Sequence, residues 1–213
     1  MHIEQVLQQW QNRDPSIMGE ANFRKYGILL PFLYIDGAPH IIFEVRSEHL
    51  RSQPGDVCFP GGRIDATDPD AEFSALRETE EELGIPRQNI RQVTPLDYIV
   101  SDAGRMIFPF VGVVDENTEF CINPDEVSEY FTVPFDYFLT TEPKKYKVHL
   151  KVEPEENFPY ELIYNGEEYN WNKRGITELF YQYNGRVIWG LTAKILTHFI
   201  TIYQQEQTQQ GKS

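Results

Sequence analysis

Hydrophobic and polar residues follow a helical spacing at both ends of the chain. Near the start, apolar residues recur at i, i+3, i+4 and i+7, at Ile3, Val6, Leu7 and Trp10. This spacing predicts an amphipathic helix over residues 1–13, which Pro15 would stop. Near the other end, the same kind of spacing predicts a helix over Gly190–Tyr203. Residues 204–213 are polar and rich in glutamine, so we expect them to fray.

Between these helices the pattern changes to short apolar runs that are typical of strands. Gly27–Ile35 and His40–Val45 are separated by a turn that contains Asp-Gly, and Leu179–Tyr183 and Arg186–Trp189 by Asn-Gly. Both dipeptides favour tight turns, so the sequence predicts two β-hairpins. Three further strands are predicted, at Arg91–Val100, Met106–Val114 and Glu119–Ile122. A short helix is predicted at Pro134–Leu139. Lys145–Val152 and Glu161–Tyr164 are predicted to form a strand pair.

The middle of the chain carries the clearest helix boundaries. Residues 47–67 lack periodicity and are rich in Gly, Pro and Asp, which predicts a long ordered loop. Asp68 is suited to cap the following helix, Pro69 to occupy its first position, and Gly84 to end it. Because strands and helices are interspersed without regular βαβ alternation, we expect an α+β fold with helices flanking a mixed sheet. No internal repeat or linker is visible, which favours one domain.

Length and composition narrow the class of protein. The chain has 213 residues, of which 40% are hydrophobic and 24% charged, as in ordinary globular proteins. Its 19 Lys and Arg against 33 Asp and Glu leave a net charge of −14, which argues against non-specific nucleic-acid or anionic-membrane binding. Cys58 and Cys121 form no CxxC pair, so neither a disulfide scaffold nor a cysteine-ligated zinc site is indicated. With no visible signal peptide and no long apolar run, we expect a soluble cytoplasmic protein.

Three glutamates lie on one face of the predicted central helix. Glu81 and Glu82 follow Glu78 at i+3 and i+4, a spacing at which like charges destabilise an isolated helix. They also lie in its C-terminal half, where the helix dipole disfavours anions. A divalent cation would reverse both effects, and carboxylate ligands suit Mg²⁺, Mn²⁺ or Ca²⁺ better than Zn²⁺. Arg77 can pair with Glu81 at i+4; the alternative is a solvated acidic face.

Together with the Gly-Gly pair upstream, this helix resembles the Nudix box. The segment Arg77–Ile85 is similar to its C-terminal half, R-E-U-x-E-E-x-G-U, where U is aliphatic, with Thr79 in place of the first U. The N-terminal half departs from the pattern. Gly62 and Arg77 are one residue farther apart than in the box, and the position of its first glutamate falls on Pro69, between two aspartates.

The preceding segment, Arg46–Gly62, carries a second and narrower resemblance. It is similar to the R-S-x3-R-x3-G-x3-F-P-G-G signature of the Nudix coenzyme A diphosphohydrolases, and every one of these positions matches. That subfamily also shows the one-residue extension of the box. The L-L-T that opens its longer pattern is Ile-Phe-Glu here, so Glu44 stands where the signature has threonine. Asn123–Val127 and Ile188–Ala193 extend the resemblance downstream, so that it covers residues 26–200.

The resemblance implies a fold and a reaction. The fold is the Nudix fold, an α/β/α sandwich with a mixed β-sheet, in a single domain over residues 1–213 whose loop-helix-loop covers residues 61–85. The reaction is metal-dependent hydrolysis of the diphosphate of coenzyme A or a derivative to 4′-phosphopantetheine and adenosine 3′,5′-bisphosphate. A Nudix hydrolase of another nucleoside diphosphate derivative, such as ADP-ribose or NADH, is the alternative. A non-catalytic nucleotide-binding Nudix domain is a third possibility.

The resemblance also assigns roles to the glutamates. Glu78 and Glu82, completed by Glu81, are expected to hold Mg²⁺ or Mn²⁺ against the diphosphate. The general base is expected to be Glu81 or Glu126. Glu126 has a second interpretation as a solvated loop carboxylate.

Substrate contacts are expected from the segment before the helix. Arg46 and Arg51 flank the predicted metal loop, and guanidinium groups suit phosphate, although surface ion pairs are the alternative. Phe59 is expected either to pack in the core or to wall the adenine or pantetheine. Gly61 and Gly62 are expected to let the backbone approach the phosphates.

Two further segments have open interpretations. Asp102, Gly104 and Arg105 lie between two predicted strands and are expected to form a turn, which could border the substrate. The aromatic-rich segment 158–183 is expected to pack a variable lobe or to form a dimer contact. A homodimer is expected from the family resemblance alone.

Overall fold

The computed structural model describes residues 2–101, 104–172 and 174–210. In these residues eight strands form a main sheet: β1 (Arg24–Ile35), β2 (Ala38–Arg46), β3 (Val57–Cys58), β4 (Gly61–Arg63), β5 (Ile90–Pro95), β6 (Ile99–Ser101), β7 (Arg105–Val114) and β8 (Val127–Pro134). A second sheet contains β9 (Lys144–Leu150), β10 (Arg174–Tyr183) and β11 (Arg186–Trp189). The α-helices are α1 (Ile3–Gln9), α2 (Ala71–Leu83), α3 (Phe135–Thr140) and α4 (Gly190–Gln210).

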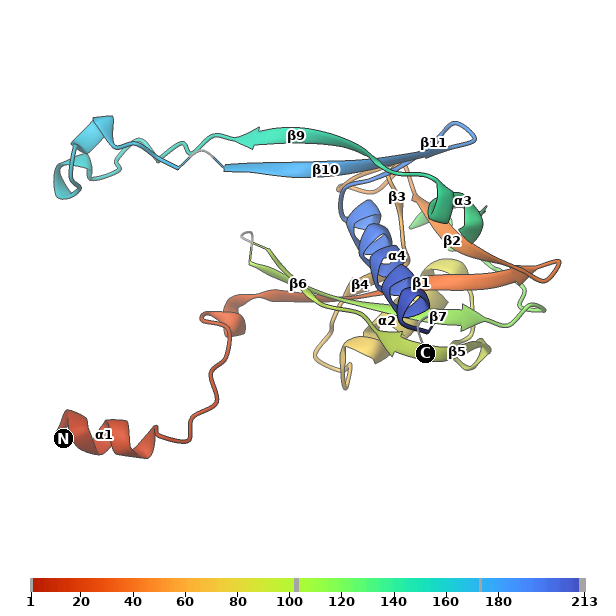
Figure 1. The fold of residues 1–213 in the computed structure, drawn as a ribbon, viewed down its shortest axis with the longest axis horizontal. Coiled ribbons are helices and arrows are strands. Elements are labelled where there is room, and N and C mark those ends of the chain that lie inside the picture. Colours follow the sequence, from red (N-terminus) through yellow and green to blue (C-terminus); the bar gives the residue numbers. More distant parts are fainter. Residues whose placement is uncertain (1, 102–103, 173, 211–213) are drawn as a thin grey trace.

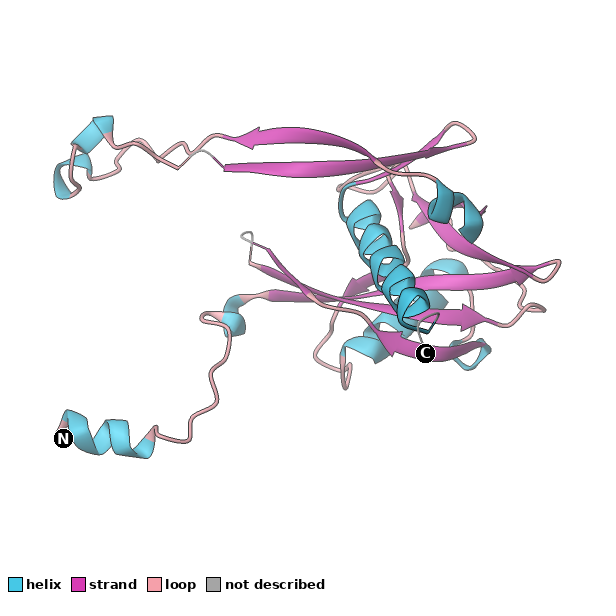
Figure 2. Ribbon diagram, viewed as in Figure 1, coloured by secondary structure: helices cyan, strands magenta, loops and turns pink. Residues whose placement is uncertain are grey.

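The main sheet is mixed, with helices on both faces. Strands β1 and β7 are parallel, from the pair Arg24–Arg105 to the pair Leu33–Val114, whereas β1 pairs with β2 and β4 in the antiparallel sense. Helix α2 covers one face of the sheet, and α4 covers the other (Figures 1 and 2). The expected α+β fold, an α/β/α sandwich with a mixed sheet, is therefore confirmed.

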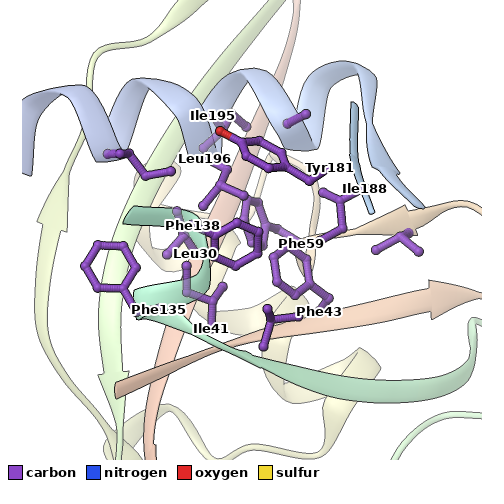
Figure 3. Packing of buried hydrophobic residues seen from close by; sticks show 14 of the residues in the cluster. Leu30, Ile41, Phe43, Phe59, Phe135, Phe138, Tyr181, Ile188, Ile195 and Leu196 are labelled. Atoms are coloured by element: carbon purple, nitrogen blue, oxygen red, sulfur yellow. The ribbon is translucent and has the colours of Figure 1, made fainter. Parts of the chain in front are cut away.

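The central strands are buried on both faces, which explains their continuous apolar runs. Successive side chains of a strand point to opposite faces. Thus Ile42 packs beneath α2, while its neighbour Phe43 packs in the cluster beneath α4 (Figure 3). In that second cluster the rings of Phe43 and Phe59 stack with their centroids 5.0 Å apart. Strands covered by helices on both sides lose the polar alternation of a half-exposed strand.

Both predicted hairpins are confirmed. Asp36 and Gly37 have φ of 51° and 78°, and Asn184 and Gly185 have φ of 47° and 82°. Two consecutive residues with positive φ are what a type I′ turn requires, and Asx-Gly pairs adopt this geometry most readily.

Helix α2 begins slightly later than the sequence predicts. Asp70, not Asp68, is its N-cap, because the Asp70 carboxylate accepts a hydrogen bond from Phe73 N at 2.8 Å. Pro69 therefore precedes the helix and does not occupy its first position. Asp68 is engaged elsewhere, accepting a hydrogen bond from Asp65 N at 2.8 Å. The predicted C-terminal boundary is confirmed, since Gly84 ends the helix with a φ of 67°.

Several strand predictions are corrected. The expected strand Arg91–Val100 is divided between β5 and β6, with an irregularity at Gln92, whose φ is 54°. Residues 119–122 form no strand in the structure. Instead Cys121 N donates to Leu83 O at 3.0 Å, so this segment covers the C-terminal end of α2. Strand β8, which pairs with β2, was not predicted; its first half is exposed at Ser128, Glu129 and Tyr130, so it lacks a continuous apolar run.

The partner of β9 also differs from the prediction. It is β10, with the register running from Leu150–Arg174 to Lys144–Phe180. The proposed partner segment instead contains a 3₁₀ turn at Tyr160–Leu162. The chain between β9 and β10 makes an excursion that projects from the body of the molecule (Figure 1). Aromatic rings of this excursion pack against one another, at Phe158, Tyr160, Tyr169 and Trp171.

The two terminal helices have other lengths than expected. Helix α1 covers only Ile3–Gln9 and buries no residue. Helix α4 continues through residues 204–210, which were expected to fray, while residues 211–213 lie outside the described part. A helix already anchored by buried residues such as Leu196 extends at little cost through glutamines, which are good helix formers. Within the described residues, no helix is long and apolar enough to cross a membrane.

Candidate metal and phosphate site

An open cleft of about 500 Å³ lies where α2, the loop before β4 and the starts of β1 and β7 meet. Acidic and basic side chains share its lining. The charged residues that line it are Glu78, Glu82, Glu126, Arg24, Arg46 and Arg105. The cleft therefore combines candidate cation ligands with candidate phosphate ligands.

Glu82 is held deep in this cleft. Its side chain belongs to the last turn of α2, the residue is only 6% exposed, and its Oε2 accepts a hydrogen bond from Gly61 N at 2.9 Å. Burial first, and then the neighbouring charge of Glu44, raise the pKa of Glu82 well above its usual value. Gly61 can present this N–H because its φ of 150° is open to glycine, and because a Cβ there would lie 2.5 Å from Gly27 O.

Glu78 lies one helical turn before Glu82 and faces the same loop. A Cβ at Gly62 would lie 2.3 Å from Glu78 Cδ, so the carboxylate occupies space that only glycine leaves free. Burial raises the pKa of Glu78, against the effect of Arg77, whose Nη2 lies 2.8 Å from Glu78 Oε1. The glycine pair thus brings the loop backbone into direct contact with the two carboxylates.

Glu81 has a different environment from the other two helix glutamates. Its side chain is 52% exposed, and its Oε2 lies 2.9 Å from Arg77 Nη1, as the i+4 spacing predicts. It does not contribute to the lining of the cleft. Glu126, the other candidate base, does line the cleft, and its charge raises the pKa of Glu78 and Glu82.

Arg77 connects α2 to the loop before it. Its Nε lies 3.0 Å from Asp68 Oδ1, and its Nη2 donates to Arg63 O at 3.2 Å. The hydrogen bonds from Arg77 are the main reason why the pKa of Asp68 falls to about 2. Asp68 therefore orients Arg77, which in turn contacts Glu78 and Glu81.

The Asp68–Arg77 pair predicts a pH dependence of stability. Since the pKa of Asp68 is about 2 in the folded state against an ordinary 3.8, its pairing stabilises the fold above pH 3.8, and the contribution is lost as the pH falls towards 2. We expect Asp68→Asn to lower the melting temperature at neutral pH, and the deficit to shrink towards zero at about pH 2. Thermal melts of the wild type and of Asp68→Asn between pH 2 and pH 7 measure this difference in melting temperature. A difference that does not vary with pH would contradict the stabilising role of the Asp68–Arg77 pair.

Glu44 is a buried acidic residue that contacts the cleft residue Cys58 without lining the cleft itself, and no sequence pattern assigned it to the site. It lies on β2 among apolar residues, is only 1% exposed, and accepts a hydrogen bond from Cys58 Sγ at 3.1 Å. Its Oε2 has no hydrogen-bond partner among the described residues. Burial raises the pKa of Glu44 to about 7, although Cys58 and then Arg46 act in the opposite direction. A charged residue within a doubly buried strand was the signal that could have identified it.

The acidic residues fit a hard divalent cation in their chemistry. The charges of Glu78, Glu82 and Glu126 act on one another and on Glu44, and all four groups offer only oxygen donors. In the described ranges no three or more His, Cys, Asp or Glu side chains form a group that could hold a metal ion, so a cation would have at most two ligands from these side chains. Mg²⁺ and Mn²⁺ tolerate such open sites because they retain water and substrate oxygens as ligands.

The basic side chains of the cleft come from three separate segments. Arg24 and Arg105 begin the parallel pair β1 and β7 and are direct neighbours in its register. Arg46 ends β2, with its Nε 3.4 Å from Ser52 O. These three residues form no salt bridge with another described residue, which leaves their guanidinium groups available to phosphate.

The other residues predicted to contact the substrate do not all line the cleft. Arg51 is exposed and does not contribute to the lining of the cleft, whereas Phe59 does. Because Phe59 is buried and stacks on Phe43, its ring also belongs to the core. Of the predicted turn, Gly104 has a φ of 67° and Arg105 begins β7, while Asp102 lies outside the described residues.

Known proteins share this sequence to different extents. The NUDIX domain family model matches residues 35–154. Peroxisomal coenzyme A diphosphatase NUDT7 of Mus musculus is 43% identical over 115 residues, which are 54% of this chain and 49% of that protein. NudL of Photorhabdus laumondii, an uncharacterized Nudix hydrolase, is 31% identical over 175 residues, which are 82% of each chain. The structure of a NUDIX hydrolase from Alicyclobacillus acidocaldarius superimposes with a TM-score of 0.47 at 18% identity, over 55% of this chain and 82% of that one.

Proposed function

This chain belongs to the Nudix hydrolase family, and from that premise we propose that it hydrolyses the diphosphate bond of coenzyme A or one of its derivatives. The products would be 4′-phosphopantetheine and adenosine 3′,5′-bisphosphate. The observation that carries the proposal is the cleft in which the residues of the Arg46–Gly62 signature meet the glutamates of α2. The mouse relative, which is named a coenzyme A diphosphatase, supports the same substrate class, although the match spans about half of its length.

The metal role falls to the buried carboxylates of α2. We propose that Glu78 and Glu82 hold Mg²⁺ or Mn²⁺, with Glu81 nearby to keep Arg77 in place. When bound, the cation supplies positive charge to the diphosphate and makes water more acidic. Glu82 is preorganised for this role because the Gly61 N–H fixes its carboxylate before any ligand arrives.

Glu126 is the better supported of the two candidate bases. It lines the cleft, and its charge acts on both Glu78 and Glu82, so it lies close to the place where an attacking water would lose its proton. Glu81 is engaged with Arg77 outside that lining. We therefore propose Glu126 as the general base and a structural role for Glu81.

The arginines are arranged for a substrate with more than one phosphate group. Coenzyme A carries a diphosphate and a separate 3′-phosphate, so it needs positive charge at two places. Arg46 lies on the signature segment, whereas Arg24 and Arg105 lie together on β1 and β7. We propose that one set binds the diphosphate and the other the 3′-phosphate, by charge-assisted hydrogen bonds. Arg51, exposed on the signature loop, is proposed to contact the substrate at the entrance.

Product analysis on a panel of substrates tests the function. The purified protein is incubated with Mg²⁺ or Mn²⁺ and coenzyme A, acetyl-coenzyme A, ADP-ribose or NADH, and the products are identified by mass spectrometry. We expect the highest kcat/KM for a coenzyme A compound, with 4′-phosphopantetheine or its acyl form as product. A preference for ADP-ribose or NADH would overturn the substrate. Absence of turnover on all four would favour a nucleotide-binding domain without catalysis.

Location and assembly remain proposals. We propose a cytoplasmic protein, while the mouse relative is peroxisomal by its name. The homodimer expected from the family resemblance stays a prediction, which the molar mass in solution would decide.

A further inference from the structure

The second sheet has one face on which large apolar side chains remain exposed. By the register of the strands, the even-numbered residues of β9 and β10 share this face with Val187 and Trp189 of β11. Its large apolar residues that are 38% to 57% exposed are Tyr146, Val148, Leu150, Ile176, Val187 and Trp189. The opposite face contributes Tyr181 and Ile188, which are buried in the cluster beneath α4 (Figure 3). The sheet therefore packs on the body through one face, while the apolar residues of the other lack a partner.

The exposed apolar residues are contiguous. Val148 and Ile176 are direct cross-strand neighbours, the rings of Tyr146 and Phe180 lie with centroids 5.5 Å apart, and Phe180 stacks on Trp189 at 5.7 Å. Glu178 belongs to the same face but is buried, with Lys194 Nζ 3.9 Å from its Oε1, so its charge does not interrupt the exposed surface. A contiguous exposed apolar surface is typical of a protein–protein interaction site.

The arm, defined as β9, β10 and the excursion at residues 151–172 between them, carries two blocks of opposite charge. Residues 144–151 contain no acidic residue and four lysines, Lys144, Lys145, Lys147 and Lys151. Residues 153–168, at the projecting end of the arm (Figure 1), contain no Lys or Arg and six glutamates, Glu153, Glu155, Glu156, Glu161, Glu167 and Glu168. Lys145 and Lys147 form no salt bridge with another described residue.

A second copy of this chain would match both the apolar face and the two charge blocks. In a two-fold dimer the same surface of each copy contacts the other, so it must be complementary to itself. If two arms lie antiparallel with their apolar faces together, the glutamates of each projecting end approach the lysines at the body end of the other β9. An anionic surface would instead be repelled by the glutamates. Pairing through the β9 edge is disfavoured, because lysines on an edge strand oppose strand addition.

We propose that the apolar face of the arm is the contact surface for a second copy of this chain, with the two arms antiparallel and their opposite charge blocks paired at the rim. An apolar centre with a polar rim is the usual composition of such an interface. The residues of the arm do not line the cleft, so each copy keeps its own site. The contact goes beyond the proposed function and does not depend on it.

Sedimentation equilibrium over a range of protein concentrations tests the contact. We expect the wild type to form dimers, and Val148→Asp to raise the dimer Kd about 100-fold or more, because the new carboxylate would be buried without a partner. Ile176→Asp, opposite Val148 in the register, should have the same effect. Both positions are exposed in the single chain, so the variants should fold, which circular dichroism verifies.

His149→Asp is the matched control. It adds the same charge to β9 at the next residue, which lies on the other face of the sheet. We expect His149→Asp to form dimers like the wild type. Loss of the dimer in His149→Asp, or unchanged dimers in both Val148→Asp and Ile176→Asp, would overturn the assigned surface. A wild type that is monomeric at every concentration would overturn it as well.

Charge reversal tests the antiparallel arrangement. One variant carries Lys145→Glu with Lys147→Glu, and the other carries Glu155→Lys with Glu156→Lys. We expect each to dimerise roughly tenfold more weakly with itself, because like charges then meet across the rim. A mixture of the two should form dimers with one copy of each, since both rim contacts become attractive again, and native mass spectrometry identifies them by mass. A mixture that forms no more dimer than either variant alone would overturn the arrangement.

Turnover of coenzyme A by the same preparations separates this contact from the proposed function. A monomeric wild type that hydrolyses coenzyme A would overturn the contact alone. A wild type that forms dimers through the arm, but turns over none of the four substrates, would confirm the contact and overturn only the proposed hydrolysis.

Discussion

A Glu82→Gln enzyme is expected to hydrolyse coenzyme A roughly 10²- to 10⁴-fold more slowly at saturating metal, since charge stabilisation by a catalytic cation is worth several kcal/mol and each 1.36 kcal/mol is tenfold in rate. The substitution removes a negative charge while the amide oxygen can still accept from Gly61 N, whose bond to Glu82 is 2.9 Å long. The local structure should therefore persist. Glu78→Gln is expected to have an effect of the same order, because the two carboxylates line the same cleft.

Glu80 offers a matched control on the same helix. Its Oε2 lies 2.8 Å from Arg87 Nε, and it does not line the cleft. We expect Glu80→Gln to retain turnover close to the wild-type level. Steady-state kinetics at several Mn²⁺ concentrations, with circular dichroism to verify folding, measure the three variants. Near-wild-type activity of Glu82→Gln and Glu78→Gln would refute the proposed metal site.

Gly62→Ala is expected to lower kcat by about 100-fold, the loss that a displacement of about 1 Å can cause in a catalytic group. The new Cβ would lie 2.3 Å from Glu78 Cδ and 2.5 Å from each carboxylate oxygen, so the side chain must move. The fold should tolerate the change, because the contact involves the mobile end of a side chain and Gly62 does not have a positive φ. The expected result is a folded protein with a displaced Glu78.

A glycine outside the site serves as the control for Gly62. At Gly175, on β10, a Cβ would lie 3.5 Å from Val148 O, an ordinary contact, and its φ is not positive. We expect Gly175→Ala to retain full activity. Steady-state kinetics, Mn²⁺ affinity and melting temperature are measured for both variants. Gly62→Ala should change the kinetics and the Mn²⁺ affinity and leave the melting temperature nearly unchanged. Wild-type kinetics for Gly62→Ala would mean that the position of Glu78 is not critical.

Elements with local boundary signals were predictable from the sequence. The Asx-Gly turns at Asp36 and Asn184 and the end of α2 at Gly84 are confirmed, because a positive φ is a property of one or two residues. The grouping of Glu78, Glu81 and Glu82 on one helix face also follows from local geometry alone. Their roles in binding metal remain proposals.

Pairings between segments that are distant in the sequence could not be predicted from local signals. The partner of β9 is β10, more than twenty residues away, and no local pattern distinguishes it from the nearer segment around Tyr160. The cap of α2 moved from Asp68 to Asp70, because Asp68 contacts Arg77, a residue nine positions later. Such choices depend on which contacts the whole fold can satisfy together.

The residues of the cleft also divide into those that the sequence could identify and those that only the fold brings together. Periodicity and spacing were enough to identify the helix, its glutamates and the glycine loop, because each depends on neighbours a few residues apart. Only the tertiary structure brought Arg24 beside Arg105, through the parallel pairing of β1 and β7, and placed Glu44 near Glu82. The pairing of Glu81 with Arg77 was predictable from the i+4 spacing, but only the tertiary structure showed that Glu81 lies outside the cleft lining. Charge and burial at a site are sums over residues from distant parts of the chain, so they exist only once the sheet has brought those residues together.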